Sequence, residues 1–430
     1  MMAQSQDKFA RNIAWVLIAI LFLKVGSYFT VSESIVITRV VKVIVRLMAT
    51  GWLILVLKQL QNRGNVTSFH WQNQAALFFY FGYLFLGLCS LLWSTKPGYS
   101  LLQLTMNTES FLFGFLFIKT YLVLRDFYPQ RATRFSALLA PALFFILAIF
   151  VIGLFVNPDT FYRLTHGGEE ARLGGYFMNP NELGMLAVIG LACSGMELYL
   201  GAPKVKHILM MAVMLFALVK TGSRSSMIGL ALILGYFIFI SKNRKLKLGM
   251  VAAGIAAVPL VVNTIIIKHG GLDEVLSMTG RLPFWKALLS EGLPKEPLFG
   301  FGYMRIAYTD AFQSVHTYAG KMTHNTFIQV LMNLGFVGFS IVLVQMIFTF
   351  SGVRKLSLQA DRLFFIGLII PLLINSFTEF GIFGETNFGI LFYQLLIWLL
   401  VVKRNPLLTL KQKVILRKKR PDLYQSWVKG

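Results

Sequence analysis

The chain has 430 residues, 56% of them hydrophobic, and its mean hydropathy is +0.66. These values lie above those of soluble domains and predict a multi-pass membrane protein. Its formal net charge of +23 comes from 41 Lys and Arg against 18 Asp and Glu, which in a soluble protein would suggest nucleic-acid binding. Here most basic residues fall in segments expected on the cytoplasmic side, so the positive-inside rule explains them and no nucleic-acid partner is expected.

About twelve apolar runs, each near the length of roughly 20 residues that spans a bilayer as a helix, predict an all-α polytopic membrane protein. Both termini are expected in the cytoplasm, with 1–430 as a single membrane domain and 404–430 as a basic tail. The first run lacks a small-residue cleavage site and precedes further spans, so a cleaved signal peptide is not expected. The runs are 12–31, 36–57, 74–94, 103–124, 135–157, 181–200, 205–221, 225–241, 248–267, 325–351, 362–379 and 386–403.

The longest polar interval between two apolar runs is 268–323, which is expected to form one large extracytoplasmic loop. Arg281 and Trp285 introduce a short amphipathic helix that is expected to lie on the membrane surface. Trp285 could stack on a sugar or anchor in the membrane interface. Arg305, further along the loop, is a candidate substrate-binding cation because the positive-inside rule does not explain it.

Three expected outer helix starts carry unusual polar residues, and the first two precede the sixth and eighth runs. Asn179 and Asn181 flank Pro180 before the sixth run and predict a turn and an N-cap, or amides that bind sugar hydroxyls. Before the eighth run, Gly222 is expected to make a tight turn and a serine to cap the helix. Arg224 then either snorkels to headgroups or binds an anion, since a cation at a helix N-terminus is unfavourable without one.

The tenth run starts at Thr323-His324-Asn325, where either Thr323 or Asn325 can cap the helix, and Asn325 is also a candidate for binding sugar. His324 is either an interfacial histidine with a satisfied hydrogen bond or a general base. Glu379, near the outer end of the eleventh run, needs a partner there; it is expected to pair with an arginine or to orient His324. Glu385 is interpreted as a solvated loop residue.

The chemistry that these residue types suit is displacement of a phosphate leaving group by a hydroxyl. Closely paired carboxylates, which ordinary glycoside hydrolysis uses, are missing. The two cysteines lie in apolar runs and no metal-ligand spacing occurs, so neither a metal nor a cofactor is expected. Arginines can hold a diphosphate without a metal, and a histidine can take the proton from the attacking hydroxyl.

In their order and shared outer location, these motifs resemble the O-antigen ligase and polymerase superfamily of bacterial envelope enzymes. The resemblance implies a twelve-helix fold similar to multi-spanning (GT-C-like) glycosyltransferases. It also implies metal-independent transfer of a glycan from undecaprenyl diphosphate to an acceptor sugar, outside the bacterial cytoplasmic (inner) membrane. The motifs that carry it are Asn179-Pro180-Asn181, Gly222-Ser223-Arg224, Gly280-Arg281 with Trp285, Gly300-Phe301-Gly302, and His324-Asn325 with Leu331, Gly335 and Gly338.

By motif match, the resemblance implies that Arg224 and Arg281 bind the diphosphate and that His324 is the base. Gly335 and Gly338 are expected to allow close helix packing. Asn333 departs from the family pattern, because related sequences often carry an acidic residue there.

Two questions stay open at the level of sequence. A polymerase would use a second lipid-linked repeat unit as acceptor, with a chain-length regulator as a further partner, whereas a ligase would use a lipid A core. The alternative function is a transporter or flippase of lipid-linked glycans, because several cations fall within apolar runs. They are Lys24, Arg39, Lys42, Arg46 and Lys119, of which three share one helical face at spacings i, i+3 and i+7.

Overall fold

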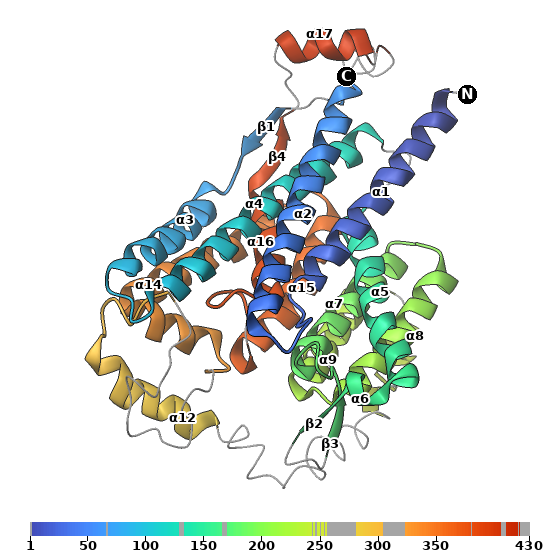
Figure 1. Cartoon of the computed structure of the whole chain (residues 1–430). Helices are drawn as coiled ribbons and strands as arrows, with labels where there is room; N and C mark the ends of the chain where they lie inside the picture. The colour runs from blue at the N-terminus through green and yellow to red at the C-terminus, as the bar shows by residue number, and fades with distance from the viewer. Residues whose placement is uncertain are drawn as a thin grey trace.

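The computed structural model of the chain is almost entirely helical (Figure 1). Its first helix starts at one end of the bundle, where α17 also lies, and α12 lies at the opposite end, which we call the loop end. The described ends of the chain therefore share one side of the bundle, as the expectation of two cytoplasmic termini requires. The residues that the structure describes are 2–65, 68–128, 133–165, 170–242, 244–245, 247–249, 251–252, 254–255, 281–303, 323–379, 381–405, 410–419 and 421.

The long helices follow the apolar runs predicted from the sequence. Eight of the described helices are long and apolar enough to cross a membrane, and α9 and α16 are shorter apolar helices. The ninth predicted run, 248–267, lies largely outside the described residues, so the count of twelve stays a prediction. The helices are α1 (Met2–Gly26), α2 (Ile35–Asn62), α3 (Gln74–Cys89), α4 (Pro97–Phe127), α5 (Phe135–Val156), α6 (Pro158–Phe161), α7 (Pro180–Tyr199), α8 (Lys204–Thr221), α9 (Arg224–Ile240), α12 (Arg281–Ala287), α14 (Thr326–Gly352), α15 (Gln359–Thr378), α16 (Phe388–Val401) and α17 (Leu410–Lys419).

Short strands and turns connect these helices. In the described part of the chain the strands form two antiparallel pairs, β1 (Ser68–Trp71) with β4 (Val402–Asn405) and β2 (Tyr162–Thr165) with β3 (Glu170–Leu173). A π-helical turn η5 (Leu288–Gly292) and a 3₁₀ turn η6 (Leu293–Lys295) continue the α12 segment. The β2–β3 hairpin lies at the loop end (Figure 1), where it holds the side chain of Arg172 near the start of α7.

The core of the bundle is built around α16, all of whose residues are buried. This helix is apolar almost all round, and such helices belong in the interior of a large protein. Its polar exception is Gln394, whose amide donates to the hydroxyl of Tyr80 on α3 (2.8 Å) and to the carbonyl of Asn107 on α4 (3.0 Å). Interhelical bonds of this kind hold helices together where apolar packing alone is not selective.

Ion pairs tie the helices together at the end of the bundle opposite α12. Arg125 on α4 pairs with Asp361 on α15 (3.0 Å), and Arg134, at the N-cap of α5, pairs with Glu197 on α7 (2.8 Å). Both arginines lie between the fourth and fifth predicted runs, 103–124 and 135–157, in a segment that falls on the cytoplasmic side when the N-terminus does. The structure shows that they also have specific structural partners.

A break in α14 fixes the segment after α12. The helix is interrupted at Gly335, whose φ of 61° lies in the left-handed region. The backbone of segment 297–302 fills the break: it donates to the carbonyls of Met332 (3.0 Å) and Asn333 (2.9 Å) and accepts from the N–H of Phe336 (2.8 Å). The prediction that Gly335 serves helix–helix packing was therefore wrong. Glycine is needed here for the backbone conformation and for the close approach of a loop.

Candidate active site

His324 lies directly before α14, in a backbone conformation that few side chains adopt. Its φ is 49°, and non-glycine residues in the left-handed region often mark functional sites. Asn325 is the N-cap of the helix, and its Oδ1 accepts hydrogen bonds from the N–H groups of Phe327 (2.9 Å) and Ile328 (3.1 Å). Of the two capping residues considered, Asn325 therefore caps α14, which holds His324 at the helix start.

Glu379 lies at the centre of the site and contacts three of its side chains. It follows the last residue of α15, and its side chain is 2% exposed. One carboxylate oxygen, Oε2, lies 2.6 Å from Nδ1 of His324, whose side chain is 29% exposed. The other, Oε1, accepts from Nη2 of Arg281 (2.7 Å) and from Nδ2 of Asn181 (2.7 Å). Both roles expected of Glu379, pairing with an arginine and contacting His324, are thus present at once.

These contacts determine the charge of Glu379. Burial raises the pKa of a carboxyl group, but the hydrogen bond and charge of His324, followed by those of Arg281, outweigh burial here. They hold the pKa of Glu379 at about 2, below its ordinary value of 4.5. Glu379 is therefore a carboxylate at neutral pH, and its Oε2 can accept a hydrogen bond from a protonated Nδ1 of His324.

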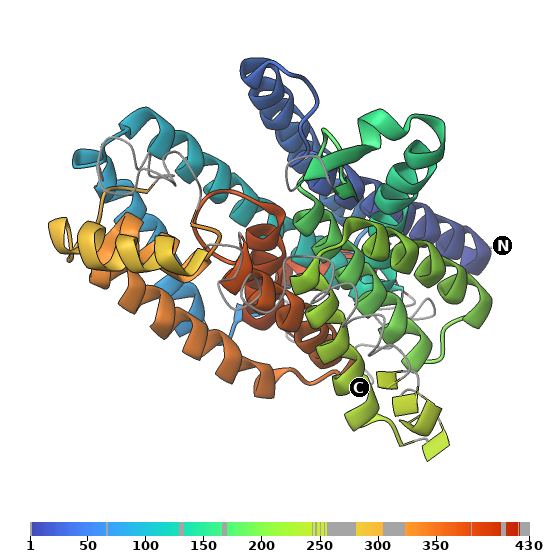
Figure 2. The same cartoon turned by 90° about the horizontal axis from the view of Figure 1, so that it is seen from below.

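Arg281 begins α12 and ties this segment to the end of α15. Its Nη1 donates to the carbonyl of Thr378, next to the ion pair that its Nη2 makes with Glu379. One turn later, Nε1 of Trp285 donates to the carbonyl of Thr323 (2.6 Å). The α12 segment is therefore docked at two points beside His324, and in Figure 2, which views the loop end, it lies alongside α14.

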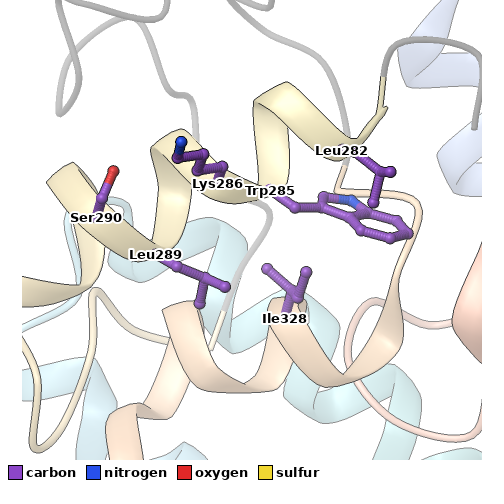
Figure 3. Close-up of a pocket in the computed structure, with 6 residues that line it drawn as sticks. All are labelled: Leu282, Trp285, Lys286, Leu289, Ser290 and Ile328. Carbon is purple, nitrogen blue, oxygen red and sulfur yellow. The ribbon is translucent and has the colours of Figure 1, made fainter. Parts of the chain in front are cut away.

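An open apolar hollow lies between the α12 segment and the first turn of α14. Its volume is about 570 Å³ (Figure 3). Trp285 and Leu282 lie on one side of it and Ile328 of α14 on the other. Leu282, the residue that follows Arg281, lines this hollow. An apolar chain in the hollow would therefore lie close to an anionic group bound by Arg281. The hollow is lined by Leu282, Trp285, Lys286, Leu289, Ser290 and Ile328.

Arg172 extends the cluster to the junction of α8 and α9. Its Nη2 donates to Oδ1 of Asn181 (2.6 Å), and its Nε donates to the carbonyl of Thr221, the last residue of α8 (2.7 Å). A cation is favourable at a helix C-terminus. Gly222 follows with φ of 59°, and Ser223 caps α9 by accepting from the N–H of Ser226. The tight turn and serine cap predicted for this motif are confirmed.

Arg224 is the first residue of α9 and is half-buried. Among the described residues it forms no ion pair, unlike Arg281. The start of its helix reaches the cluster through Ser226, whose Oγ donates to the carbonyl of Asn181 (3.4 Å). Arg281 and His324 thus meet at one carboxylate, and Arg224 opens the helix that packs beside them.

Three further residues were predicted to belong to the site, and each has a different outcome. Asn179 caps α7, accepting from the N–H of Asn181 (2.9 Å), as predicted. Trp285 faces the hollow, and its N–H bonds the backbone before His324. Arg305 lies outside the described residues. In the described ranges no three His, Cys, Asp or Glu side chains gather closely enough to hold a metal ion.

Sequence reasoning missed two participants. Arg172 was not chosen as a site residue from the sequence, because only its place in a hairpin beside Asn181 distinguishes it from other arginines. Glu385 was interpreted as a solvated loop residue, which was wrong. It is half-buried and accepts a hydrogen bond from the hydroxyl of Tyr99 on α4, because the chain between α15 and α16 folds back onto the bundle.

Comparison with known proteins gave a match to a protein family. No curated protein matches the chain. Residues 209–343 match the family model described as O-antigen ligase, and this stretch contains Arg224, Arg281 and His324. The motifs had indicated a resemblance to the O-antigen ligase and polymerase superfamily, and over this stretch the family match supports it.

Proposed function

We propose that the protein transfers a glycan from undecaprenyl diphosphate to the hydroxyl of an acceptor sugar. The family match indicates a function of the O-antigen ligase or polymerase type. The observation that carries the detailed proposal is the carboxylate of Glu379, which contacts His324 with one oxygen and Arg281 with the other. A base and a cation are thereby held on opposite sides of one buried group.

In this proposal His324 is the general base. A hydrogen bond from Nδ1 to Glu379 keeps the proton on Nδ1, so Nε2 carries the lone pair. Nε2 takes the proton from the acceptor hydroxyl while the oxygen of that hydroxyl forms a bond to the anomeric carbon of the donor sugar. A positioned base of this kind contributes about 10²–10⁴ in rate.

Arg281 and Arg224 would bind the diphosphate. As the bond between the anomeric carbon and the diphosphate oxygen breaks, the leaving group gains negative charge, which cations nearby stabilise. Arg281 uses donors on two nitrogens for Thr378 and Glu379, and a guanidinium carries five N–H donors, so donors remain for a phosphate. The start of α9, with its N-terminal N–H groups, favours the same charge.

The other proposed substrate contacts have supporting roles. The apolar hollow beside Arg281 suits the first isoprene units of a polyprenyl chain. Asn181 and Asn325 already use both atoms of their amides within the protein, so each would contact sugar through the second N–H of its NH₂ group. Asn179, Trp285 and Arg305 are proposed to contact the glycan.

The proposed setting is the outer face of a bacterial cytoplasmic membrane, with the loop end of the bundle outside. The acceptor would be a second lipid-linked repeat unit or a lipid A core, and a chain-length regulator is a proposed partner in the first case. No metal takes part in the proposed step, because arginines neutralise the diphosphate.

The test is a transfer assay with the purified protein in lipid nanodiscs and a lipid-diphosphate glycan. We expect His324→Ala to lower single-turnover transfer by about 10²–10⁴, and Arg281→Ala and Arg224→Ala each to lower it by about 10–100-fold, as loss of a charged hydrogen bond predicts. Transfer should persist after treatment with a chelator.

Lys295→Ala serves as a matched control, since this cation is exposed, lies in η6 on the segment that follows Arg281 and does not line the apolar hollow. It should retain transfer within about twofold. Full transfer by a folded His324→Ala variant would overturn the assignment of the base, and loss of transfer with the chelator would overturn metal independence.

A further inference from the structure

A second polar cavity lies at the loop end, between α2, α4 and the first turn of α7. We call it the α2 cavity; its volume is about 430 Å³. Pockets of this size hold small ligands or parts of larger ones. It is lined by Tyr28, Thr30, Ile35, Arg39, Lys42, Val43, Arg46, Tyr99, Leu102, Gln103, Met106, Phe177, Met178, Asn179, Glu182, Glu385, Thr386, Asn387 and Phe388.

Three cations of one helix face run down the wall of this cavity. Arg39 is exposed at its mouth, Lys42 is half-buried, and Arg46 is only 2% exposed. Their spacing of three and four residues spreads them over about 10 Å along the axis of α2. The transport alternative was based partly on these cations, and the structure shows that they line one cavity at one end of the bundle.

Arg46 is the unusual member of this set. Its guanidinium lies 4.1 Å over the ring of Tyr28, but its Nε and Nη1 are buried and have no hydrogen-bond partner among the described residues. Lys24, an equally buried cation nearby, differs because it pairs with Glu109 (2.6 Å). A buried charge without a hydrogen-bonded partner is costly, and an ionisable group kept inside a membrane protein usually serves function.

The rest of the lining suits a sugar. Gln103, Asn179 and Asn387 present amides, and Glu182 and Glu385 present carboxyl groups, all of which can bond hydroxyls. Aromatic side chains, including Tyr28 and Tyr99, offer faces for a sugar ring. The three cations outnumber the two carboxyl groups, so the cavity has an excess of one positive charge when all five are ionised.

The cavity lies next to the candidate active site. Asn179 lines the cavity, and Asn181, two residues later in the same turn, donates to Glu379. The first turn of α7 therefore separates the two, with the cavity on one side and the cluster of His324 and Arg281 on the other.

We propose that the α2 cavity is a glycan subsite that binds a sugar residue carrying one anionic group, a carboxylate or a phosphate. This inference rests on the proposed function for the identity of the ligand as a glycan. The anion bonds Arg46 and Lys42, and the sugar ring contacts the amides and aromatic side chains around them. Charged hydrogen bonds to a buried arginine supply the affinity, and Arg39 attracts the anion to the mouth.

The test is equilibrium binding to the full-length protein in phosphatidylcholine nanodiscs. The probes are cellobiouronic acid, glucose 1-phosphate, neutral cellobiose and farnesyl diphosphate. We expect at least one anionic sugar to bind at least tenfold more tightly than cellobiose, and Arg46→Gln to remove that preference. The anionic sugar that binds identifies the source of the charge. Binding of farnesyl diphosphate alone through Arg46, or equal binding of charged and neutral sugars, would overturn the proposal.

Two controls separate this proposal from others. Lys58→Gln removes an exposed cation of α2 that does not line the cavity, and it should leave binding within twofold. His324→Ala should leave binding of the anionic sugar unchanged, so failure of the proposed transfer chemistry and failure of the subsite can be told apart.

If Arg46 only stabilised the fold, Arg46→Gln would lower the melting temperature of the protein. The proposed subsite predicts the opposite. Because Nε and Nη1 of Arg46 are buried without a hydrogen-bonded partner in the described part of the chain, Arg46→Gln should melt at or above the wild-type temperature without ligand and should no longer bind the anionic sugar. A lower melting temperature with unchanged binding would overturn the proposal. If this variant does not fold, Arg39→Gln and Lys42→Gln take its place in the test. Each should weaken binding of the anionic sugar at least threefold and leave binding of cellobiose unchanged.

Discussion

Replacing Glu379 by glutamine is the sharpest test of how the site is held. The change keeps the size of the side chain but converts one oxygen to an NH₂ group. Oε1 accepts from both Arg281 and Asn181, whereas Oε2 contacts His324. An NH₂ group at the first position would face two donors and leave them buried and unpaired, at about 1–3 kcal/mol each. The amide oxygen should therefore stay with Arg281, and the NH₂ group should face His324.

That orientation reverses the hydrogen bond to His324. Nδ1 must then accept, so the neutral ring carries its proton on Nε2, and Nε2 can no longer take a proton from the acceptor hydroxyl. We expect Glu379→Gln to lower single-turnover transfer by about 10²–10⁴, the full contribution of a general base. Because Arg281 keeps its partner, binding of the lipid diphosphate should change by less than about threefold.

The assay compares single-turnover rate and donor affinity in nanodiscs for the wild type and two variants. Glu291→Gln is the matched control, because this exposed glutamate lies in η5, on the segment that follows Arg281. It should behave as the wild type in both measurements. Transfer by folded Glu379→Gln within threefold of wild type would refute the role assigned to the carboxylate.

Three further predictions concern the stability and docking of the site. The pKa of Glu379 is lowered from 4.5 to about 2, so its folded-state contacts contribute about 3 kcal/mol above pH 4.5. This contribution is lost as pH falls toward 2, and the melting temperatures of wild type and Glu379→Gln should converge over that range; a constant difference would contradict it. Gly335→Ala places a Cβ 2.2 Å from the carbonyl carbon of Leu298 at a φ of 61°, so the variant should melt several degrees lower or fail to fold, and an unchanged melting curve would contradict the close approach. Trp285→Phe removes the bond to Thr323 and should lower transfer by about 3–10-fold with little change in melting temperature, whereas unchanged transfer would show that this bond does not position α12.

Local patterns predicted the helix starts well. The caps at Asn179, Ser223 and Asn325 follow from side chains that bond backbone groups two or three residues away. The turn at Gly222 follows from the freedom of glycine to adopt a positive φ. The helix break at Gly335 was not predicted, because it depends on a loop whose backbone replaces the missing helical bonds. From the sequence alone, a glycine in an apolar run that allows close helix packing cannot be distinguished from one that breaks a helix.

Composition and hydropathy determined that this is a helical membrane protein, and motif order indicated a resemblance to the O-antigen ligase and polymerase superfamily, because both depend on residues close together along the chain. The nomination of His324, Arg281 and Glu379 as site residues also came from sequence. The sequence did not predict that these residues contact one another, because His324 and Glu379 are 55 residues apart along the chain, and Arg281 and Glu379 are 98 apart. Only the packing of α12, α14 and α15 at one end of the bundle decides that a single carboxylate contacts both. The same holds for α2, whose cations share a face by periodicity, while the neighbouring helices determine that this face borders a cavity with Arg46 at its buried end.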